Sequence, residues 1–290
     1  MKAPWNRIAD LTGRRGAEKE RAAPKAPPMP DAPPALMERI EAMLRGCGTG
    51  AGVFPPAVLF NERWLLRLIL DWFSRHQVTE HPLSFPENGR WFSDILLPSP
   101  FVGAGRRPKT GDPPCELGGL IGHFDVPDLE SPLVSASPQT LHLMAVEATM
   151  SGEMAPGVTG ARYLDQTART VAGMAEALRR ANRRPSGLDR IGFYVIAPYA
   201  LITAGGLQKE MSRESIGRKV KRRVKSFTPS KERWHGDWFQ PTLERVEVGI
   251  IAWEQVIERL GQQDGPAAAP IEEFYHRCLE LSKRQAGESR

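Results

Sequence analysis

The spacing of hydrophobic and polar residues predicts strands and helices that alternate along the chain. Segments with helical character lie at 33–44, 60–76, 160–182, 212–227 and 271–284. Apolar runs predict strands at 119–126, 141–148, 190–199 and 245–253. This alternation indicates one α/β domain in which helices flank a mixed sheet.

Proline and glycine mark the segments between these elements. Residues 1–34 contain seven prolines, mixed charges and little apolar periodicity, which is typical of a disordered tail. The folded domain is therefore expected at 35–290. Residues 98–119 are expected to form a long loop, and 261–270 a linker within the domain.

The strand expected at 141–148 ends in polar residues. Glu147 and Thr149 are two positions apart, so both side chains leave the strand on one face. A polar group at the end of a buried strand is a favoured place for chemistry in α/β folds. Strand ends also carry charged residues because they reach solvent, so the sequence leaves both interpretations open.

Pairing with the preceding strand identifies a second carboxylate. If the two strands form an antiparallel hairpin, Leu120 lies opposite Glu147. Gly118 then lies opposite Thr149 and offers no side chain. Glu116 lies at the same end of the hairpin and, because side chains alternate, on the same face.

Glu62 lies within the apolar side of a predicted helix. On a helical wheel, Ile69 and Phe73 fall within about 20° of it. A carboxylate in an apolar stripe must meet a cation, a metal ion or a set of hydrogen-bond donors. The free backbone N–H groups of the first helical turn provide a structural explanation, and metal binding a functional one.

Positive charge is concentrated in one part of the chain. Residues 209–233 contain ten Lys or Arg and three Glu, a local charge of +7, whereas the whole chain carries +5. A concentrated basic patch fits a polyanionic partner, although a solvated helix face has the same composition. The candidate phosphate contacts in the helix at 212–227 are Lys219, Lys221, Arg222 and Arg223.

Polar residues of two further segments could also contact phosphates. In the helix expected at 160–182, Arg162, Gln166 and Arg169 lie opposite the apolar stripe, so they face solvent or a ligand. The long loop adds Arg106, Arg107 and Lys109.

Other sequence features exclude several classes of protein. The three cysteines are scattered without metal-ligand spacing, which argues against a disulfide framework and structural zinc and favours a reducing cytoplasm. The first residues lack an apolar signal core, and no apolar run is long enough for a membrane span. Nucleophile-elbow, dinucleotide-binding and P-loop motifs are absent from the sequence.

The chain resembles the PD-(D/E)XK nuclease superfamily, most closely a bacterial branch of it. The likeness is carried by "NERWLLRLILDWF", "WFSDILLPSPF", "GLIGHF", "VEATMSGEMAPGVTGARYLDQTAR", "FYVIAP" and "AWEQVI", which span most of the chain from residue 60 to 257. The resemblance implies a restriction-endonuclease-like fold and a partner that is nucleic acid, DNA in the first place. It also implies Mg²⁺-dependent hydrolysis of a phosphodiester, as in an endo- or exodeoxyribonuclease.

The resemblance also implies roles for individual residues. Glu62 and Glu147 match two metal-binding carboxylates of the superfamily, and Thr149 stands at the position of its lysine. The third carboxylate is expected near Gly118, where Glu116 is the first substitute and Asp94 the second. Arg162 or Arg169 could supply a displaced cation.

Because two positions depart from the superfamily's pattern, the ancestral hydrolysis could be degenerate. The alternative is a non-catalytic interaction module, which keeps the fold and binds DNA, RNA or a protein partner through the basic patch. Metal-dependent cleavage distinguishes the two hypotheses.

Overall fold

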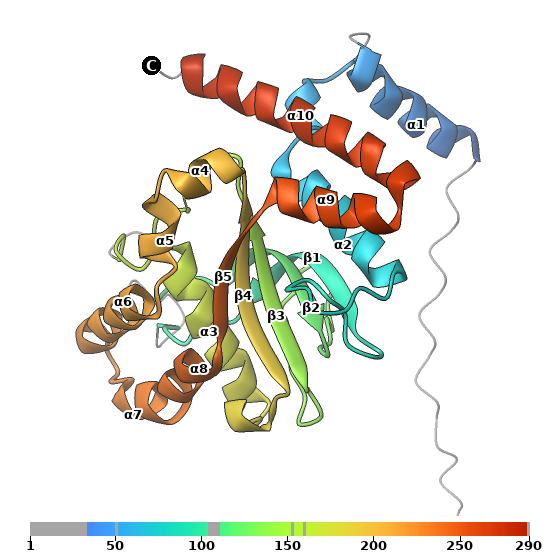
Figure 1. Cartoon of the computed structure of the whole chain (residues 1–290). Coiled ribbons are helices and arrows are strands. Elements are labelled where there is room, and N and C mark those ends of the chain that lie inside the picture. Colours follow the sequence, from blue (N-terminus) through green and yellow to red (C-terminus); the bar gives the residue numbers. More distant parts are fainter. Residues whose placement is uncertain (1–33, 50–51, 104–110, 152–153, 159–160, 289–290) are drawn as a thin grey trace, which may run out of the picture.

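A computed structural model describes residues 34–49, 52–103, 111–151, 154–158 and 161–288 (Figure 1). The tail expected at 1–34 lies outside the described residues except for Pro34, and Arg106, Arg107 and Lys109 lie outside them as well. Across the described ranges, no helix combines the length and the apolar character needed to cross a bilayer.

Five strands form one mixed sheet in the order β1-β2-β3-β4-β5. They are β1 (Arg90–Leu97), β2 (Cys115–Gly122), β3 (His142–Ala148), β4 (Arg190–Ala197) and β5 (Glu247–Ala252). β2 pairs antiparallel with both β1 and β3, whereas β4 pairs parallel with both β3 and β5. The expected class, a mixed sheet flanked by helices, is confirmed.

Helices cover both faces of this sheet (Figure 1). One face packs against α2 (Glu62–Arg75), α9 (Trp253–Gln263) and α10 (Gly265–Glu288), and the other against α3 (Gln166–Arg180), α6 (Arg213–Ser226) and α8 (Gln240–Arg245). In β3, Leu143 and Ala145 belong to the α3 side of the core, and Met144 and Val146 to the α2 side. Because side chains alternate along a strand, Glu147 follows on the α3 side.

The remaining helices are short, apart from α1. They are α1 (Pro34–Thr49), α4 (Tyr199–Thr203), α5 (Gly206–Glu210), α7 (Glu232–Trp234), a π-helix (His235–Phe239) and 3-10 turns at Pro56–Val58 and Pro185–Gly187. The helices from α4 to α8 lie between β4 and β5 in the chain and form the parallel crossover.

Capping residues decide where the two helices nearest the site begin. The Asn61 side chain accepts backbone N–H groups of Arg63 and Trp64, both at 3.1 Å, so α2 begins at Glu62. The Asp165 carboxylate accepts the N–H of Ala168 at 3.2 Å, so α3 begins six residues later than the expected 160. Both caps place a functional candidate in a first helical turn.

Several sequence expectations about element boundaries are wrong. β1 was not expected, and β2 begins four residues earlier than predicted, which shortens the long loop. The expected linker at 261–270 is mostly helical, since α9 runs to Gln263 and α10 starts at Gly265 with Pro270 inside it. Ala267 and Ala268 pack on the core from this segment, and such burial outweighs the weak helix propensity of its glycines and prolines.

The register of the β2–β3 hairpin also differs from the expected one. Leu120 lies opposite Ala145, not Glu147, so the pairing is displaced by two residues. A displacement by two leaves each side chain on its face, which is why the hydrophobic pattern alone did not select between the registers.

Candidate functional site at the end of strand β3

Glu147 is held where β2 and β3 separate. Their backbone pairing ends at Gly119 and Val146, and the next donor, the Gly118 N–H, bonds to Glu147 Oε1 at 3.1 Å. Gln166 in the first turn of α3 donates its Nε2 to the same oxygen at 2.9 Å. The carboxylate thus replaces a backbone partner at the strand end and is oriented by a helix on one side of the sheet.

Burial dominates the electrostatics of Glu147. Desolvation raises its pKa to about 7, although the hydrogen bonds from Gln166, Gly118 and Ala148 and the charge of Arg63 act in the opposite direction. Neutral donors compensate only part of the cost of burying an anion. Near neutral pH, Glu147 therefore exchanges a proton, and a bound cation would favour the ionised form.

A pocket of about 360 Å³ opens above Glu147. Glu62 and Thr149 line it together with Glu147, Gly118 and Met154. Glu62 is half-buried, and Ile69 and Phe73 on its side of α2 are fully buried, as the helical wheel predicted. No hydrogen bond or ion pair of the Glu62 carboxylate occurs among the residues that the structure describes.

Glu116 does not join this pocket. Its side chain is 58% exposed, and Oε1 pairs with Nη1 of Arg63 at 2.9 Å. Asp94, the other substitute considered for the third carboxylate, pairs with both Arg63 and Arg67. Both acids are therefore neutralised by arginines of α2, and the described residues contain no group of three or more His, Cys, Asp or Glu arranged to hold a metal ion.

Thr149 is buried and lines the pocket. Its hydroxyl lies 3.3 Å from the Ser151 hydroxyl, and its carbonyl accepts the Trp253 indole N–H at 3.4 Å. The side chain adds a polar group but no charge.

The three polar residues expected on the outer face of the helix after β3 have different environments. Gln166 is buried against Glu147 and also donates to the Glu116 carbonyl, so the expectation that it faces solvent or a ligand is wrong. Arg162 is exposed, in the turn before α3. Arg169 donates to the carbonyls of Pro113 and Pro114, at 3.3 and 3.1 Å.

The four basic candidates of α6 divide into two pairs. Arg223 is buried, and its guanidinium makes two hydrogen bonds with the Asp112 carboxylate, at 2.7 and 3.1 Å. Lys219 pairs with Asp165, the residue that caps α3. The structure thus corrects the expectation that Arg223 and Lys219 are available to phosphates. Both lie on the side of α6 that carries the buried residues Ile216, Val220 and Val224.

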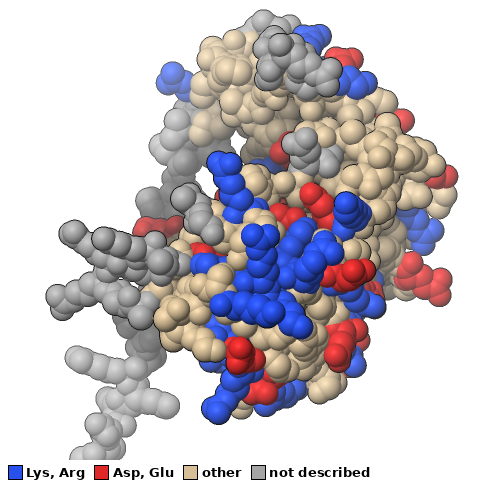
Figure 2. Space-filling model, turned by 90° about the vertical axis from the view of Figure 1, so that its left-hand side faces the viewer, with Lys and Arg blue, Asp and Glu red and all other residues tan. Residues whose placement is uncertain are grey.

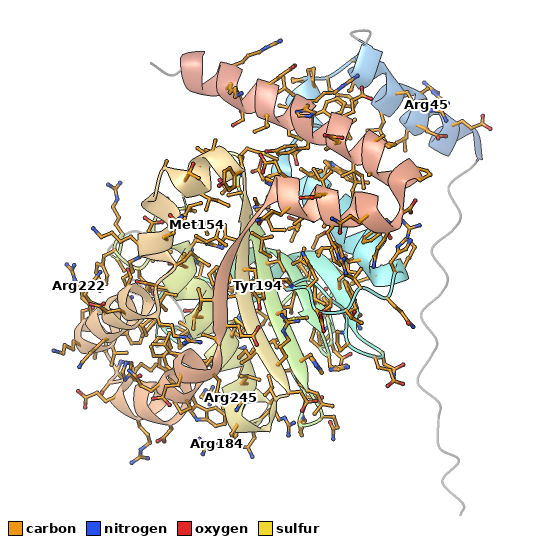
Figure 3. The ribbon with its side chains drawn as sticks, viewed as in Figure 1. Arg45, Met154, Arg184, Tyr194, Arg222 and Arg245 are labelled. Atoms are coloured by element: carbon orange, nitrogen blue, oxygen red, sulfur yellow. The ribbon has the colours of Figure 1, made fainter. Side chains whose placement is uncertain are left out.

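Lys221 and Arg222 are exposed on the same helix. The Arg222 guanidinium lies 3.9 Å from the centre of the Tyr163 ring, and Figure 3 shows this arginine at the outer edge of the molecule. In Figure 2, Lys and Arg side chains gather on the side of the molecule that carries α6, with acidic side chains beside them. A basic surface remains although half of the candidates are structural.

Two functional details were missed by sequence reasoning. Arg63, the neighbour of Glu62, contributes a positive charge next to Glu147 and Glu116. Gln166 orients Glu147, a contact that becomes visible only when the start of α3 is known. The sole sequence signal was the pair Asp165-Gln166, a capping residue followed by a polar side chain in the first turn.

Comparisons of the chain with protein-family models, with curated proteins and with solved structures found no match.

Proposed function

We propose that the chain is a nucleic-acid-binding protein that resembles the PD-(D/E)XK class, with a reduced, Mg²⁺-dependent phosphodiesterase site formed by Glu62 and Glu147. The observation that carries this proposal is the pocket at the end of β3, which both carboxylates line. Donors on one side of Glu147 fix its orientation before any ligand binds.

The chemistry of Mg²⁺ fits two carboxylates better than a complete protein cage. Mg²⁺ retains several waters and is commonly bound by one or two carboxylates together with substrate phosphates. Glu62 and Glu147 would therefore supply the protein ligands, and a phosphate of the nucleic acid would complete the site. A bound Mg²⁺ activates water and neutralises charge that develops on the phosphate.

The exposed cations supply the electrostatic part of the proposal. Lys221 and Arg222 lie on α6, and Tyr163 beside Arg222 belongs to the turn that precedes α3. The same turn follows the segment that contributes Met154 to the pocket. A nucleic-acid strand held by these cations would therefore lie on residues close in sequence to those that line the pocket. Phosphate contacts would dominate the affinity of the protein for this strand.

A second candidate is the non-catalytic interaction module. It is favoured by the pairing of Glu116 and Asp94 with arginines and by the uncharged Thr149, since these positions supply neither a third carboxylate nor a lysine. The same basic surface would then bind a nucleic acid without cleaving it.

Cleavage of labelled single- and double-stranded DNA and RNA in Mg²⁺ or Mn²⁺ tests the site. We expect Glu147→Gln and Glu62→Gln to lower the rate by roughly 100-fold or more, as when a group that stabilises developing charge is lost. Glu116→Gln, an exposed carboxylate outside the pocket, is the matched control and should cleave like the native chain. Equal loss in all three variants, or a rate independent of metal, would contradict the proposed site.

Binding is tested separately, in EDTA, by the salt dependence of affinity. Lys221→Gln with Arg222→Gln should weaken binding and lower the slope of log affinity against log salt by about two. Lys283→Gln with Arg284→Gln on α10 removes the same charge elsewhere and is the control. If the native chain binds nucleic acid but does not cleave it in Mg²⁺ or Mn²⁺, the interaction module is supported. If the α6 variant binds with unchanged affinity and salt dependence, the proposed basic surface is refuted.

A further inference from the structure

Two histidines meet at the opposite end of the β2–β3 hairpin from Glu147. His123 directly follows β2, His142 begins β3, and the His123 N–H donates to the His142 carbonyl at 3.0 Å. Their ring centres are 5.4 Å apart, with the ring planes at 64°. Both rings line a cavity of about 660 Å³, which neither the carboxylate pocket nor the basic surface includes.

Hydrogen bonding determines which nitrogen of His123 carries the proton. Its Nε2 lies 2.9 Å from the Glu87 carbonyl, which can only accept, so Nε2 is the donor. In the neutral ring, Nδ1 is then an unprotonated lone pair. Metal-binding histidines commonly show this arrangement, in which the nitrogen away from the metal donates to a carbonyl.

The two Nδ1 atoms have no partner within the described part of the chain. Both are buried, and neither makes a hydrogen bond there. A buried polar atom without a partner is costly, and native structures rarely contain one.

The two rings lie close enough for one metal ion to bond to both. An ion bonded at about 2.1 Å to each Nδ1 would lie about 3.2 Å from each ring centre, and the ring centres are 5.4 Å apart. Imidazole nitrogens are ligands that zinc, copper and nickel ions accept readily, whereas Mg²⁺ prefers oxygen.

We propose that His123 and His142 bind a transition-metal cation of the zinc class through their Nδ1 atoms. The described residues contain no group of three or more candidate ligands, so water or a small exogenous ligand in the cavity fills the remaining positions. The site is independent of Glu147 and requires a different metal, so it does not depend on the proposed nuclease-like function.

The backbone around the pair is built to hold it in place. Gly122 has φ +138°, and a Cβ on it would lie 2.2 Å from the His142 carbonyl oxygen. The Thr140 hydroxyl donates to the His123 carbonyl at 2.9 Å. Glycine thus permits the close approach of the two strands that brings the rings together.

The test uses the full, untagged, metal-free chain and follows the histidine ring nitrogens by NMR as Zn²⁺ is added. We expect Nδ1 of His123 and His142 to shift while His76 and His276 do not, and calorimetry to give one Zn²⁺ per chain. Mg²⁺ should leave the two rings unchanged. Unshifted rings in excess Zn²⁺ would overturn the proposal and indicate that water satisfies both nitrogens.

Variants provide the second arm of the test. His123→Ala and His142→Ala should each weaken Zn²⁺ binding by roughly tenfold or more, as for loss of a group that directly supports a metal. His276→Ala, on the exposed side of α10, should bind like the native chain. Zn²⁺ binding that is retained in both hairpin variants refutes the assignment even if the ring signals move.

Discussion

The two ends of the β2–β3 hairpin treat polar side chains in opposite ways. At one end, Glu147 accepts hydrogen bonds from Gly118 and Gln166, and its pKa still rises to about 7 because it is buried. At the other end, the Nδ1 atoms of His123 and His142 are buried without a partner among the described residues. Protein donors therefore fix the Glu147 carboxylate at one end. At the other end, the two Nδ1 atoms remain available to a ligand.

A glycine of β2 makes each end possible, for a different reason. Gly118 leaves room for the carboxylate, since a Cβ there would lie 3.2 Å from Glu147 Oε2. Gly122 has a backbone conformation that other residues rarely adopt and approaches the opposite carbonyl closely. At both ends the hairpin brings polar groups together through backbone proximity. Protein donors bind the Glu147 carboxylate at one end, whereas the two Nδ1 atoms at the other end have no partner among the described residues.

The largest expected effect comes from Gly122→Ala. Strain at its positive φ, together with contact of the new Cβ with the His142 carbonyl, should lower the free energy of unfolding by at least about 3 kcal/mol. Gly118→Ala meets more adaptable neighbours and should cost about 1 kcal/mol. Urea denaturation measures both, and equal costs would contradict the distinction between the two glycines.

Glu147→Gln should change stability in a pH-dependent way. Because the folded-state pKa is raised from 4.5 to about 7, the native state keeps its proton while the unfolded chain loses it, so stability falls as pH rises through this window. In metal-free buffer the variant should be more stable than the native chain at pH 8, by on the order of 2 kcal/mol, and similar at pH 4.

Denaturation in EDTA at both pH values checks this, with Glu116→Gln as the exposed control. A variant less stable than the native chain at pH 8 would show that Glu147 is stabilising when ionised, contrary to its assignment as a site residue held at an energetic cost.

Gln166→Leu should raise the pKa of Glu147 further, because the hydrogen bond that most favours the ionised carboxylate is lost while the packing volume is kept. The carboxyl ¹³C shift of Glu147, followed against pH, measures the midpoint. If the midpoint does not move, Gln166 has a packing role and does not orient the carboxylate.

Arg63→Gln should have the smallest effect. Arg63 also favours ionised Glu147, but it is 44% exposed and shared with Glu116 and Asp94, so the pKa should rise by less than in Gln166→Leu. Added salt should reduce the difference from the native chain, since exposed charges are screened. A larger shift than that of Gln166→Leu would reverse the proposed order of the two contributions.

Sequence patterns anticipated most of the fold, and they failed where tertiary packing overrides local preference. The strands β3, β4 and β5 and the helices α2 and α6 follow from apolar spacing. In α6, the apolar residues Ile216, Val220 and Val224 recur at helical spacing and are buried. β1 was missed. The proline-containing start of α10 was predicted as a linker, but it is helical because packing against neighbouring helices stabilises it.

The same distinction applies to the candidate site, where sequence patterns identified some residues and tertiary packing decided the positions of others. The strand-end position identified Glu147 and Thr149, and the helical wheel identified Glu62. All three line one pocket. The hydrophobic pattern left the hairpin register open by two residues, and with it the neighbours of Glu147. Glu116 turned out to pair with Arg63, and Gln166 turned out to be buried, since both depend on where α2 and α3 start and dock.

The sequence by itself determined the class of fold, the amphipathic faces and the presence of a carboxylate at the end of β3, because these depend on local periodicity. The tertiary structure alone decided which polar side chains share a pocket, which basic residues of α6 are buried in ion pairs, and that His123 lies opposite His142. Those relations join residues distant in the chain, and their distances are set by strand register and helix docking, which no local pattern encodes.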